Sequence, residues 1–391
     1  MISTQQAIEI LKANNSILPP QKLPIFDCLG LASAEDVYAP IDVPLFDNSA
    51  MDGYVFKYRD YLSQIPIKVG AEIQAGALVL KPLPDTEAAR IFTGAPVPKY
   101  GDTVVAQEDV TIENGFLKFN KQIEQGANIR LQGTQTKKGS LILRKNTLLT
   151  ASYLGFLATF GIATIKVYPK PKIGIISTGK ELVQAGQTLK NHQIFESNSI
   201  FLKAGLKEMG LNIEFAISVD DNEALLKETI QNHFKDVDIL ILTGGISVGD
   251  YDFVKPVLES LQTEELFYKV KQKPGKPLYF GRLGKTAIFA LPGNPSAVVT
   301  CFYTYLKPYL KAMMGISNFE QNSYGILISA YYKKAGLTHF VKAFVENNKV
   351  EILPNQLSYQ MDAYSKANAF AVLKAEQESF QQGEKIEVIK F

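Results

Sequence analysis

The chain is poor in the residues that bind soft metals or form disulfides. Its 391 residues include only two cysteines, Cys28 and Cys301, and three histidines, His192, His233 and His339. The cysteines lie far apart in sequence, which excludes a disulfide scaffold and any cysteine-rich zinc or iron–sulfur site. No two histidines stand at helical spacing, so a histidine-based zinc site is not predicted either. A hard cation held by oxygen ligands remains compatible with this composition.

An excess of charge of one sign is also missing. There are 41 basic and 39 acidic side chains, which gives a net charge of +2, and hydrophobic residues make up 46%. That balance provides no basic footprint for nucleic acid and is ordinary for a soluble globular protein. At about 150 residues per domain, the length predicts two to four domains.

Neither an export signal nor a membrane span is predicted. The first residues, MISTQQAIE, contain no basic segment followed by an apolar one. The one stretch of membrane length, residues 146–165, contains four threonines and two glycines. We interpret it as a buried helix of a soluble protein, capped by Thr150 and stopped by Gly161. These features predict a cytoplasmic protein without a membrane partner.

The pattern of secondary structure changes along the chain. An amphipathic helix with Thr4 as its cap is predicted over residues 4–13, and short alternating runs between residues 45 and 145 indicate a small all-β region. After residue 169, apolar strands alternate with helices. The strands are expected at 172–177, 212–219, 238–242 and 286–291, and the helices at 197–209, 222–234 and 295–311. This alternation predicts a parallel sheet covered on both faces, and β strands follow again after Gly315.

Three loops follow predicted strands of that sheet and are rich in glycine and small polar residues. They are residues 177–181 (STGKE), 243–252 (TGGISVGDYD) and 291–296 (LPGNPS). Ligands of open parallel sheets bind beyond the carboxyl ends of the strands. Glycines let backbone N–H groups approach an anion, and a helix N-terminus adds partial positive charge. The loops therefore predict a nucleotide or phosphate site.

The first loop does not form a P-loop. Gly174 to Lys180 has the P-loop spacing, but Glu181 replaces the Ser or Thr that would hold magnesium. A second near-match, Gly284-Lys285-Thr286, fails because Tyr279 stands where the first glycine belongs. The sequence therefore argues against a P-loop NTPase.

Charged side chains accompany the same loops. Asp220 and Asp221 follow one strand, and Asp250 and Asp252 lie in the second loop. Each aspartate alone is more often a cap or turn residue, but four at one edge of a sheet favour a magnesium site. The segment 273–277 (KPGKP) displays two ammonium groups on a rigid turn, which suits an oxyanion. An exposed turn with solvated lysines explains that segment equally well.

Two polar loops of the β region, 47–54 (DNSAMDGY) and 93–98 (TGAPVP), lie far in sequence from these residues. Each alone is a turn cluster. A joint site with the α/β region would need contact between domains or between subunits.

Six motifs in order make the chain similar to the molybdopterin molybdenumtransferase family, which includes MoeA and the E domain of gephyrin. They are residues 46–54, 93–98, 177–182, 244–249, 273–277 and 291–295, and they span nearly the whole chain. The resemblance implies a multidomain fold of α/β plus β domains. Its parts would be a linker domain (1–44 with 146–168), a small β domain (45–145), a central MogA-like, doubly wound, mostly parallel sheet domain (169–316) and a C-terminal β-barrel (317–391).

The resemblance also implies a function. A member of this family inserts molybdate into adenylylated molybdopterin with the help of magnesium, releases AMP and forms the molybdenum cofactor. It acts as a homodimer whose cleft lies between the α/β domain of one subunit and the β domain of the other. Molybdopterin adenylyltransferase and the molybdoenzymes that receive the cofactor are the further partners expected.

Roles for individual residues follow from the same resemblance. Asp52 and Thr93 of the second subunit, together with Glu181, would act in catalysis. Asp220 and Asp252 would hold magnesium, with Asp250 beside them as a further catalytic candidate. Lys273 and Lys276 would bind molybdate. The pterin phosphate and AMP would be held by Thr178, Gly179, Gly244, Gly245, Ser247, Gly249, Pro292, Gly293, Asn294 and Pro295.

Some positions depart from the family pattern. Lys180 stands where an acidic residue is common, Lys342 stands where an arginine is usual, and Ser365 lies in an altered serine segment. A lysine offers a point charge rather than a planar fork, so the oxyanion contacts of the C-terminal domain stay open. Two other functions also stay open: a non-catalytic molybdopterin-binding scaffold, and the adenylyltransferase of the preceding step. The sequence does not separate molybdate from tungstate.

Overall fold

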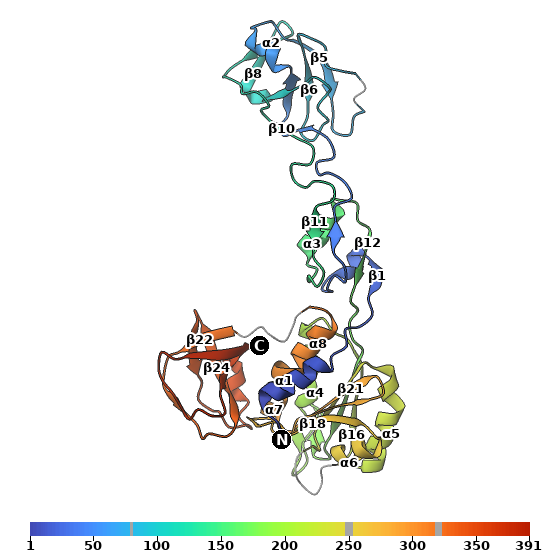
Figure 1. Ribbon diagram of the computed structural model, residues 1–391, viewed down its shortest axis with the longest axis vertical. Helices are drawn as coiled ribbons and strands as arrows, with labels where there is room; N and C mark the ends of the chain where they lie inside the picture. The colour runs from blue at the N-terminus through green and yellow to red at the C-terminus, as the bar shows by residue number, and fades with distance from the viewer. Residues whose placement is uncertain (79–80, 247–252, 317–322) are drawn as a thin grey trace.

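The computed structural model describes residues 1–78, 81–246, 253–316 and 323–391. The molecule is elongated, with a small β region at one end and an α/β unit beside a β-barrel at the other (Figure 1). A narrow connecting part lies between them. Within the described ranges no helix is long and apolar enough to cross a membrane.

The small β region is built on one six-stranded sheet in the order β7-β4-β6-β5-β9-β8. Its strands are β4 (Gly53–Phe56), β5 (Lys68–Ile73), β6 (Glu87–Ile91), β7 (Thr103–Ala106), β8 (Val110–Glu113) and β9 (Phe116–Phe119), and one short helix, α2 (Tyr58–Leu62), joins β4 to β5. A Cβ at Gly53 would lie 1.9 Å from the carbonyl oxygen of Val105, so β4 and β7 approach closely only because residue 53 is glycine.

The connecting part pairs two segments that are distant in sequence. Strand β1 (Gln21–Pro24) pairs with β12 (Thr164–Val167), and β2 (Val37–Tyr38) pairs with β11 (Leu141–Leu143). The ladder of β3 (Asn48–Ser49) with β10 (Ile129–Arg130) follows toward the small β region.

Helix α3 (Ala151–Ala158) begins and ends as the sequence predicts. The Thr150 hydroxyl accepts the N–H of Tyr153, and Gly161 adopts a φ of +71° just after the helix. The expectation of a buried helix is wrong for the single chain, because only Leu157 of α3 is buried. The helix lies against η1 (Ile25–Cys28), where the Phe26 side chain is 85% exposed. The two elements thus present an apolar surface to the outside.

The α/β unit contains the predicted sheet. Its order is β16-β13-β17-β21-β20-β18, and the first four strands are parallel. These are β13 (Ile173–Thr178), β16 (Ile213–Val219), β17 (Ile239–Thr243) and β21 (Thr286–Leu291). The antiparallel edge strands β18 (Glu264–Tyr268) and β20 (Tyr279–Leu283) were not predicted. The sheet is therefore mostly parallel.

Helices cover both faces of this sheet. Helix α4 (Asn198–Glu208) packs on one face beside α7 (Pro295–Cys301), which continues through a π-helical turn (Phe302–Leu306) into α8 (Lys307–Met313). Helices α5 (Glu223–His233) and α6 (Val254–Ser260) cover the other face. Two short strands, β14 (Leu182–Val183) and β15 (Ile194–Phe195), and the turn η3 (Phe234–Asp236) complete the unit.

The N-terminal helix α1 (Thr4–Ala13) belongs to the α/β core by its packing. Ser3, rather than Thr4, caps it through a reciprocal pair of hydrogen bonds with Gln6. Ala7 and Leu11 are fully buried in the hydrophobic cluster of the sheet, and the Asn15 side chain donates to the carbonyl oxygen of Tyr309. The predicted linker range of residues 1–44 thus begins with a helix that packs on the α/β unit (Figure 1).

The C-terminal region is a closed five-stranded barrel in the order β24-β25-β22-β28-β26, with β26 returning to β24. Its strands are β22 (Ser323–Leu327), β24 (Thr338–Glu346), β25 (Lys349–Ile352), β26 (Ala369–Leu373) and β28 (Lys385–Lys390), beside the short pair β23 (Tyr331–Tyr332) and β27 (Ser379–Phe380) and the turn η5 (Asp362–Ser365). Strand β19 (Gln272–Lys273) of the α/β unit pairs with β24 and joins the two units. Val341 and Ala343 face the barrel core, whereas Phe340 packs toward the α/β unit.

Candidate functional site

The four parallel strands end at one level, which forms an edge that we call the rim. Ser177 stands opposite Thr243, Thr243 stands opposite Leu291, and Thr178 stands opposite Val219. The loops that the sequence singled out therefore leave the sheet side by side. The near-continuous apolar strands β13, β17 and β21 fix this register, because each is buried on both faces.

Two of the rim loops interlock through glycines. Gly244 has a φ of +93°, and a Cβ there would lie 2.3 Å from the carbonyl oxygen of Thr178. A Cβ on Gly293 would lie 3.5 Å from the Cα of Gly244. Gly245 also has a positive φ, of +54°. Any side chain at position 244 would separate the loops, which explains the glycine pair physically.

Two buried oxygen atoms at the rim have no hydrogen-bond partner among the described residues: Oγ1 of Thr178 and Oδ1 of Asn198. The Asn198 side chain uses its other atom, Nδ2, to donate to Thr243 Oγ1 (3.2 Å) and to the Gly293 carbonyl oxygen (2.8 Å). Buried polar atoms are nearly always bonded in proteins, and exceptions gather at functional sites. The rim therefore has unsatisfied acceptors where a ligand is expected.

The sequence argument missed Asn198 and its neighbour Glu196. Glu196 is 3% exposed, and its carboxylate accepts the backbone N–H and the hydroxyl of Ser199 at the start of α4. The run Glu196-Ser197-Asn198-Ser199 was available as a signal. It has the composition of an ordinary helix cap, and Glu196 indeed acts as one, so the run alone did not point to the rim.

The third loop connects the rim to the barrel. Asn294 caps α7, with Oδ1 accepting the N–H of Ser296, and its Nδ2 donates to the hydroxyl of Ser358 (3.1 Å). The Ser296 and Tyr364 hydroxyl oxygens lie 2.8 Å apart. The barrel segment 357–365 thus forms a wall beside the PGNP loop.

Lys342 holds this wall in place. It is 2% exposed, and its Nζ donates to the carbonyl oxygens of Asn355 (2.7 Å), Leu357 (3.2 Å) and Gln360 (2.7 Å). A lysine has three N–H donors, so all of them are used. Burial lowers the pKa of Lys342, and Asp362 acts in the opposite direction. Lys342 therefore has no donor left for an oxyanion.

Ser365, the other open position of this domain, donates its hydroxyl to the carbonyl oxygen of Asp362 (2.7 Å). Its hydroxyl proton is thus engaged within its own turn.

The charged candidates lie exposed around the rim. Lys273 and Lys276 are exposed on the KPGKP turn, which is fixed against α7 because a Cβ on Gly275 would lie 2.8 Å from Cys301 Sγ. Glu181 and Asp220 are exposed at the ends of the first loop and of β16. Gly179, before Glu181, has a φ of +147°. Next to it, the Lys180 N–H donates to Asp221.

Four predicted residues, Ser247, Gly249, Asp250 and Asp252, lie outside the described residues. Of the predicted magnesium ligands, the structure therefore places only Asp220. Elsewhere in the described ranges, no three His, Cys, Asp or Glu side chains come close enough to hold a metal ion.

Asp52 and Thr93 meet in the small β region, and we call them the tip pair. Asp52 Oδ1 accepts both the backbone N–H and the hydroxyl of Thr93, each at 2.7 Å. The backbone N–H of Thr93, then its hydroxyl, and to a lesser degree Arg90 hold the pKa of Asp52 below its usual value of 3.8. Arg90 is kept nearby by stacking on Tyr54, with 5.0 Å between the guanidinium carbon and the ring centre. In the tip pair, Thr93 thus holds the ionised carboxylate of Asp52 in a fixed position.

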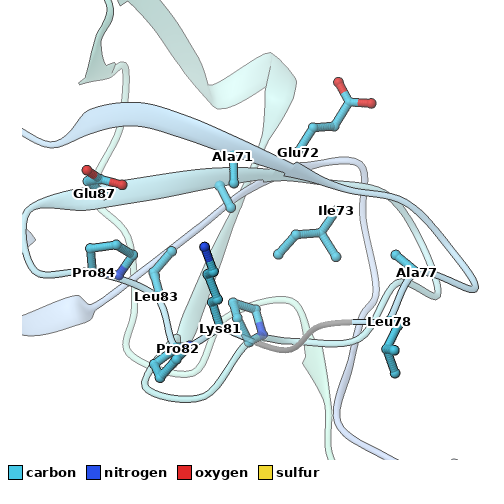
Figure 2. A pocket seen from close by; sticks show the side chains of 12 residues that line it. Ala71, Glu72, Ile73, Ala77, Leu78, Lys81, Pro82, Leu83, Pro84 and Glu87 are labelled. Atoms are coloured by element: carbon cyan, nitrogen blue, oxygen red, sulfur yellow. The ribbon is translucent and has the colours of Figure 1, made fainter.

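The tip pair and the rim stand at opposite ends of one chain, because the sheet carrying β4 and β6 lies far from β16 and β21 (Figure 1). The small β region also contains a cavity of about 410 Å³. Ile73, Leu83 and Lys81 turn toward it (Figure 2). Neither Asp52 nor Thr93 lines this cavity, so it is separate from the tip pair.

Comparison with known families covers most of the chain in three parts. Residues 2–161 match the MoeA N-terminal region (domain I and II). Residues 174–312 match the probable molybdopterin binding domain, and residues 325–391 match the MoeA C-terminal region (domain IV).

Individual relatives agree with these matches. A molybdopterin molybdenumtransferase of Haemophilus influenzae is 34% identical over 366 residues, which cover 92% of this chain and 90% of that protein. One from Staphylococcus aureus is 30% identical, covering 99% and 95%. Two structures of the molybdopterin biosynthesis MoeA protein from Pyrococcus horikoshii superpose with TM-scores of 0.86 and 0.82, at 29% and 26% identity, and cover this chain fully and 99% and 100% of theirs.

Proposed function

Because the chain belongs to the MoeA family, we propose that it is a molybdopterin molybdenumtransferase, which inserts molybdenum into molybdopterin during synthesis of the molybdenum cofactor. We further propose that adenylylated molybdopterin and molybdate are its substrates and that AMP is released. The observation that supports this best is the rim, where glycine loops and unsatisfied oxygens from three strand ends converge on one place.

The rim would bind the phosphate part of the substrate. The backbone N–H groups of Gly245 and Gly293 would be suited to phosphate oxygens, since both glycines lie in loops that follow rim strands. The amide oxygen of Asn198 only accepts hydrogen bonds, whereas the Thr178 hydroxyl can both accept and donate one. They are therefore suited to the N–H and O–H groups of a bound nucleotide or pterin.

Magnesium would bind at the same edge. Asp220 directly follows β16, beside the end of β13, and Asp252 is the second ligand that the family resemblance implies. Oxygen donors on a phosphate-binding rim fit a hard cation, which would offset charge as the phosphoanhydride breaks. Glu181, exposed on the neighbouring loop, would orient the water that attacks.

Lys273 and Lys276 would bind molybdate. Both ammonium groups are exposed, and Gly275 and two prolines hold the turn between them rigid. A tetrahedral dianion needs point-like positive charges, which lysine provides. Because all three donors of Lys342 are used, these two lysines would carry the molybdate contacts without help from that position.

The complete site would need two subunits. The tip pair is too far from the rim within one chain, so the Asp52 carboxylate would reach a rim in a homodimer (Figure 1). The exposed apolar surface of α3 and η1 supports this, because a second copy would bury it. Further partners would be the adenylyltransferase that supplies the substrate and molybdoenzymes that receive the product, all in the cytoplasm.

Of the alternatives, the adenylyltransferase is disfavoured because the family matches include the N-terminal region and the barrel as well as the molybdopterin-binding domain. A non-catalytic scaffold is tested by measuring AMP release from adenylylated molybdopterin with magnesium, with and without molybdate. We expect molybdate-dependent release of AMP and a metal-loaded product. Tight binding of the substrate without AMP release would support the scaffold instead.

The two-subunit site is tested by mixing variants. Asp52→Asn and Lys276→Ala would each be inactive alone, whereas random mixed dimers contain one intact cleft and would restore about one quarter of the wild-type activity. A control mixture of Asp52→Asn with Asp52→Ala, which both remove the same carboxylate, should restore nothing. If the first mixture also stays inactive while mixed dimers are shown to form, the shared cleft is disproved.

A further inference from the structure

A second cavity with a basic lining lies where β24 begins, at the end of the barrel that meets the KPGKP turn. Its volume is about 530 Å³. Strand β19 contributes Lys273, the segment after β22 contributes Tyr331 to Leu337, and β24 contributes His339 to Val341; Gln356 and Leu357 close it. No acidic residue among those that the structure describes lines it.

Positive charge in this cavity comes from three lysines. The ammonium group of Lys333 is held within the lining of this cavity, because its Nζ donates to the carbonyl oxygens of Leu337 (3.1 Å) and Ala375 (3.3 Å). Lys273 and Lys334 are exposed, and their ammonium groups make no hydrogen bond or ion pair with any part of the chain that the structure describes. Two cations with unused donors thus line the cavity.

His339 is the third group with an unused polar atom. It stands opposite Lys273 in the parallel ladder and opposite Leu373 of β26, and its ring has no hydrogen bond within the described residues. Burial, followed by the charges of Lys333 and Lys273, lowers the pKa of His339 to about 4. The ring is therefore neutral at neutral pH, and a negative charge in the cavity would make its protonation easier.

Every charged side chain that lines the cavity around His339 is a lysine. Strand β19 brings Lys273, the segment after β22 brings Tyr331 and Lys333, and β26 brings the apolar Leu373. Burial lowers the pKa of Lys333, and Glu376 and Glu378 act in the opposite direction without lining the cavity. A cavity that collects cations without a counter-charge is suited to an anion.

We propose that this cavity is a second anion site, which binds a tetrahedral dianionic group through Lys273, Lys334 and His339. It meets the wall beside the PGNP loop at Leu357 but does not use Lys342. His339 and Val341 lie on the opposite side of β24 from Lys342, because side chains alternate along a strand. This site rests on the proposed function only at Lys273, which the molybdate contacts proposed above also use. Its volume admits either a free inorganic dianion or a phosphate monoester beside Tyr331 and Leu337.

The histidine count makes a direct test possible. The chain has only three histidines, so their ring signals are easily resolved by NMR. We would titrate pH in sodium sulfate and in sodium chloride of equal ionic strength, since sulfate stays a dianion throughout. Sulfate should raise the pKa of His339 by about one unit or more and leave His192 and His233 unchanged.

Variants locate the site. Lys334→Gln should weaken sulfate binding and reduce the shift of His339. The matched control is Lys349→Gln, an exposed lysine near the other end of β24, which should retain the full shift. Equal titration of His339 in sulfate and chloride, or an unchanged shift in Lys334→Gln, would overturn the proposal.

Further measurements identify the ligand and separate this site from the proposed transferase function. At pH 7.5, where AMP and molybdate are both dianions, a lower concentration of AMP than of molybdate needed for half of the change in the His339 ring signals assigns a phosphate monoester, and the reverse order assigns a free dianion. The AMP-release assay is independent of this readout. If sulfate does not raise the pKa of His339 but AMP release is normal, only the second site is rejected. If sulfate raises that pKa but no AMP is released, only the transferase function is rejected.

Discussion

The rim and the tip pair use opposite physical means. At the rim, the described contacts are made by backbone, glycines and buried neutral side chains, with Thr178 and Asn198 left unsatisfied. At the tip, one exposed carboxylate is held by two hydrogen bonds from Thr93. The rim is therefore suited to shape-dependent binding, and it fails when its packing changes. The tip is suited to supplying a fixed negative charge, and it changes with little effect on folding.

The largest effect should come from closing the space between the rim loops. In Gly244→Ala the new Cβ would lie 2.3 Å from the Thr178 carbonyl oxygen at a φ of +93°. The loops must move by about an ångström, so AMP release should fall by about 100-fold. Gly284→Ala is the control, because it has a positive φ of +61° but no atom within 4 Å. Equal activity of the two variants would show that loop packing at the rim does not matter.

The wall beside the rim should depend on Lys342 for stability. Lys342→Met removes the donor shared by the carbonyls of Asn355, Leu357 and Gln360 and should destabilise the barrel by about 1–3 kcal/mol. Faster hydrogen exchange of amides 355–366 would be the measurement. Lys390→Met, at an exposed barrel position, should leave exchange unchanged. A wall that stays protected in Lys342→Met would show that the ammonium does not hold it.

Thr178→Val separates ligand binding from folding at the rim. The Thr178 hydroxyl has no partner in the described residues, so its removal should leave the free energy of unfolding unchanged or raise it by up to about 1 kcal/mol. Affinity for adenylylated molybdopterin should nevertheless fall. Binding titration and denaturant unfolding on the same preparation measure both. A variant that loses stability but binds normally would mean that the hydroxyl already has a structural partner.

The smallest effect is expected at the tip, as a change in titration. Thr93→Val removes the hydroxyl donor to Asp52 but keeps the backbone N–H, which is the larger cause of the lowered pKa. The pKa should rise but remain below 3.8. A carboxylate with a lowered pKa stabilises the fold above its unfolded pKa and loses that effect as pH falls through the folded value. Between pH 5 and 8 the variant should therefore be slightly less stable than the wild type, and the difference should disappear as pH falls through the folded pKa of Asp52, by carboxyl NMR and thermal unfolding.

The sequence allowed the rim to be predicted because its strands are apolar along their whole length. The predicted strand at 286–291 is β21 itself, and those at 172–177 and 238–242 are each shifted by one residue from β13 and β17. The antiparallel edge of β18 and β20 was missed because its pairing depends on tertiary contact. The tip pair was predicted as two separate loops, and only the fold brings Asp52 to Thr93.

Other residues could not be predicted from pattern alone. In the sequence, Lys342 cannot be told from a surface lysine. Only its position on β24 turns its side chain toward three carbonyl oxygens. Glu196 and Asn198 resemble a helix cap until α4 places them behind the rim. Helix α3 has the composition of a buried helix, but nothing within one chain covers its described residues beyond Leu157. In each case the decisive contact lies far away in sequence or in another molecule.

The position of α1 has a consequence for the order in which the protein is made. Its end is fixed by the bonds of Asn14 and Asn15 to Tyr309, 295 and 294 positions further along the chain. At a ribosomal rate of about 5–20 residues per second, the first helix waits roughly 15–60 s for this partner. During that time Ala7 and Leu11 lack the partners that bury them in the folded chain. Helix α1 is thus among the last elements to reach its final contacts.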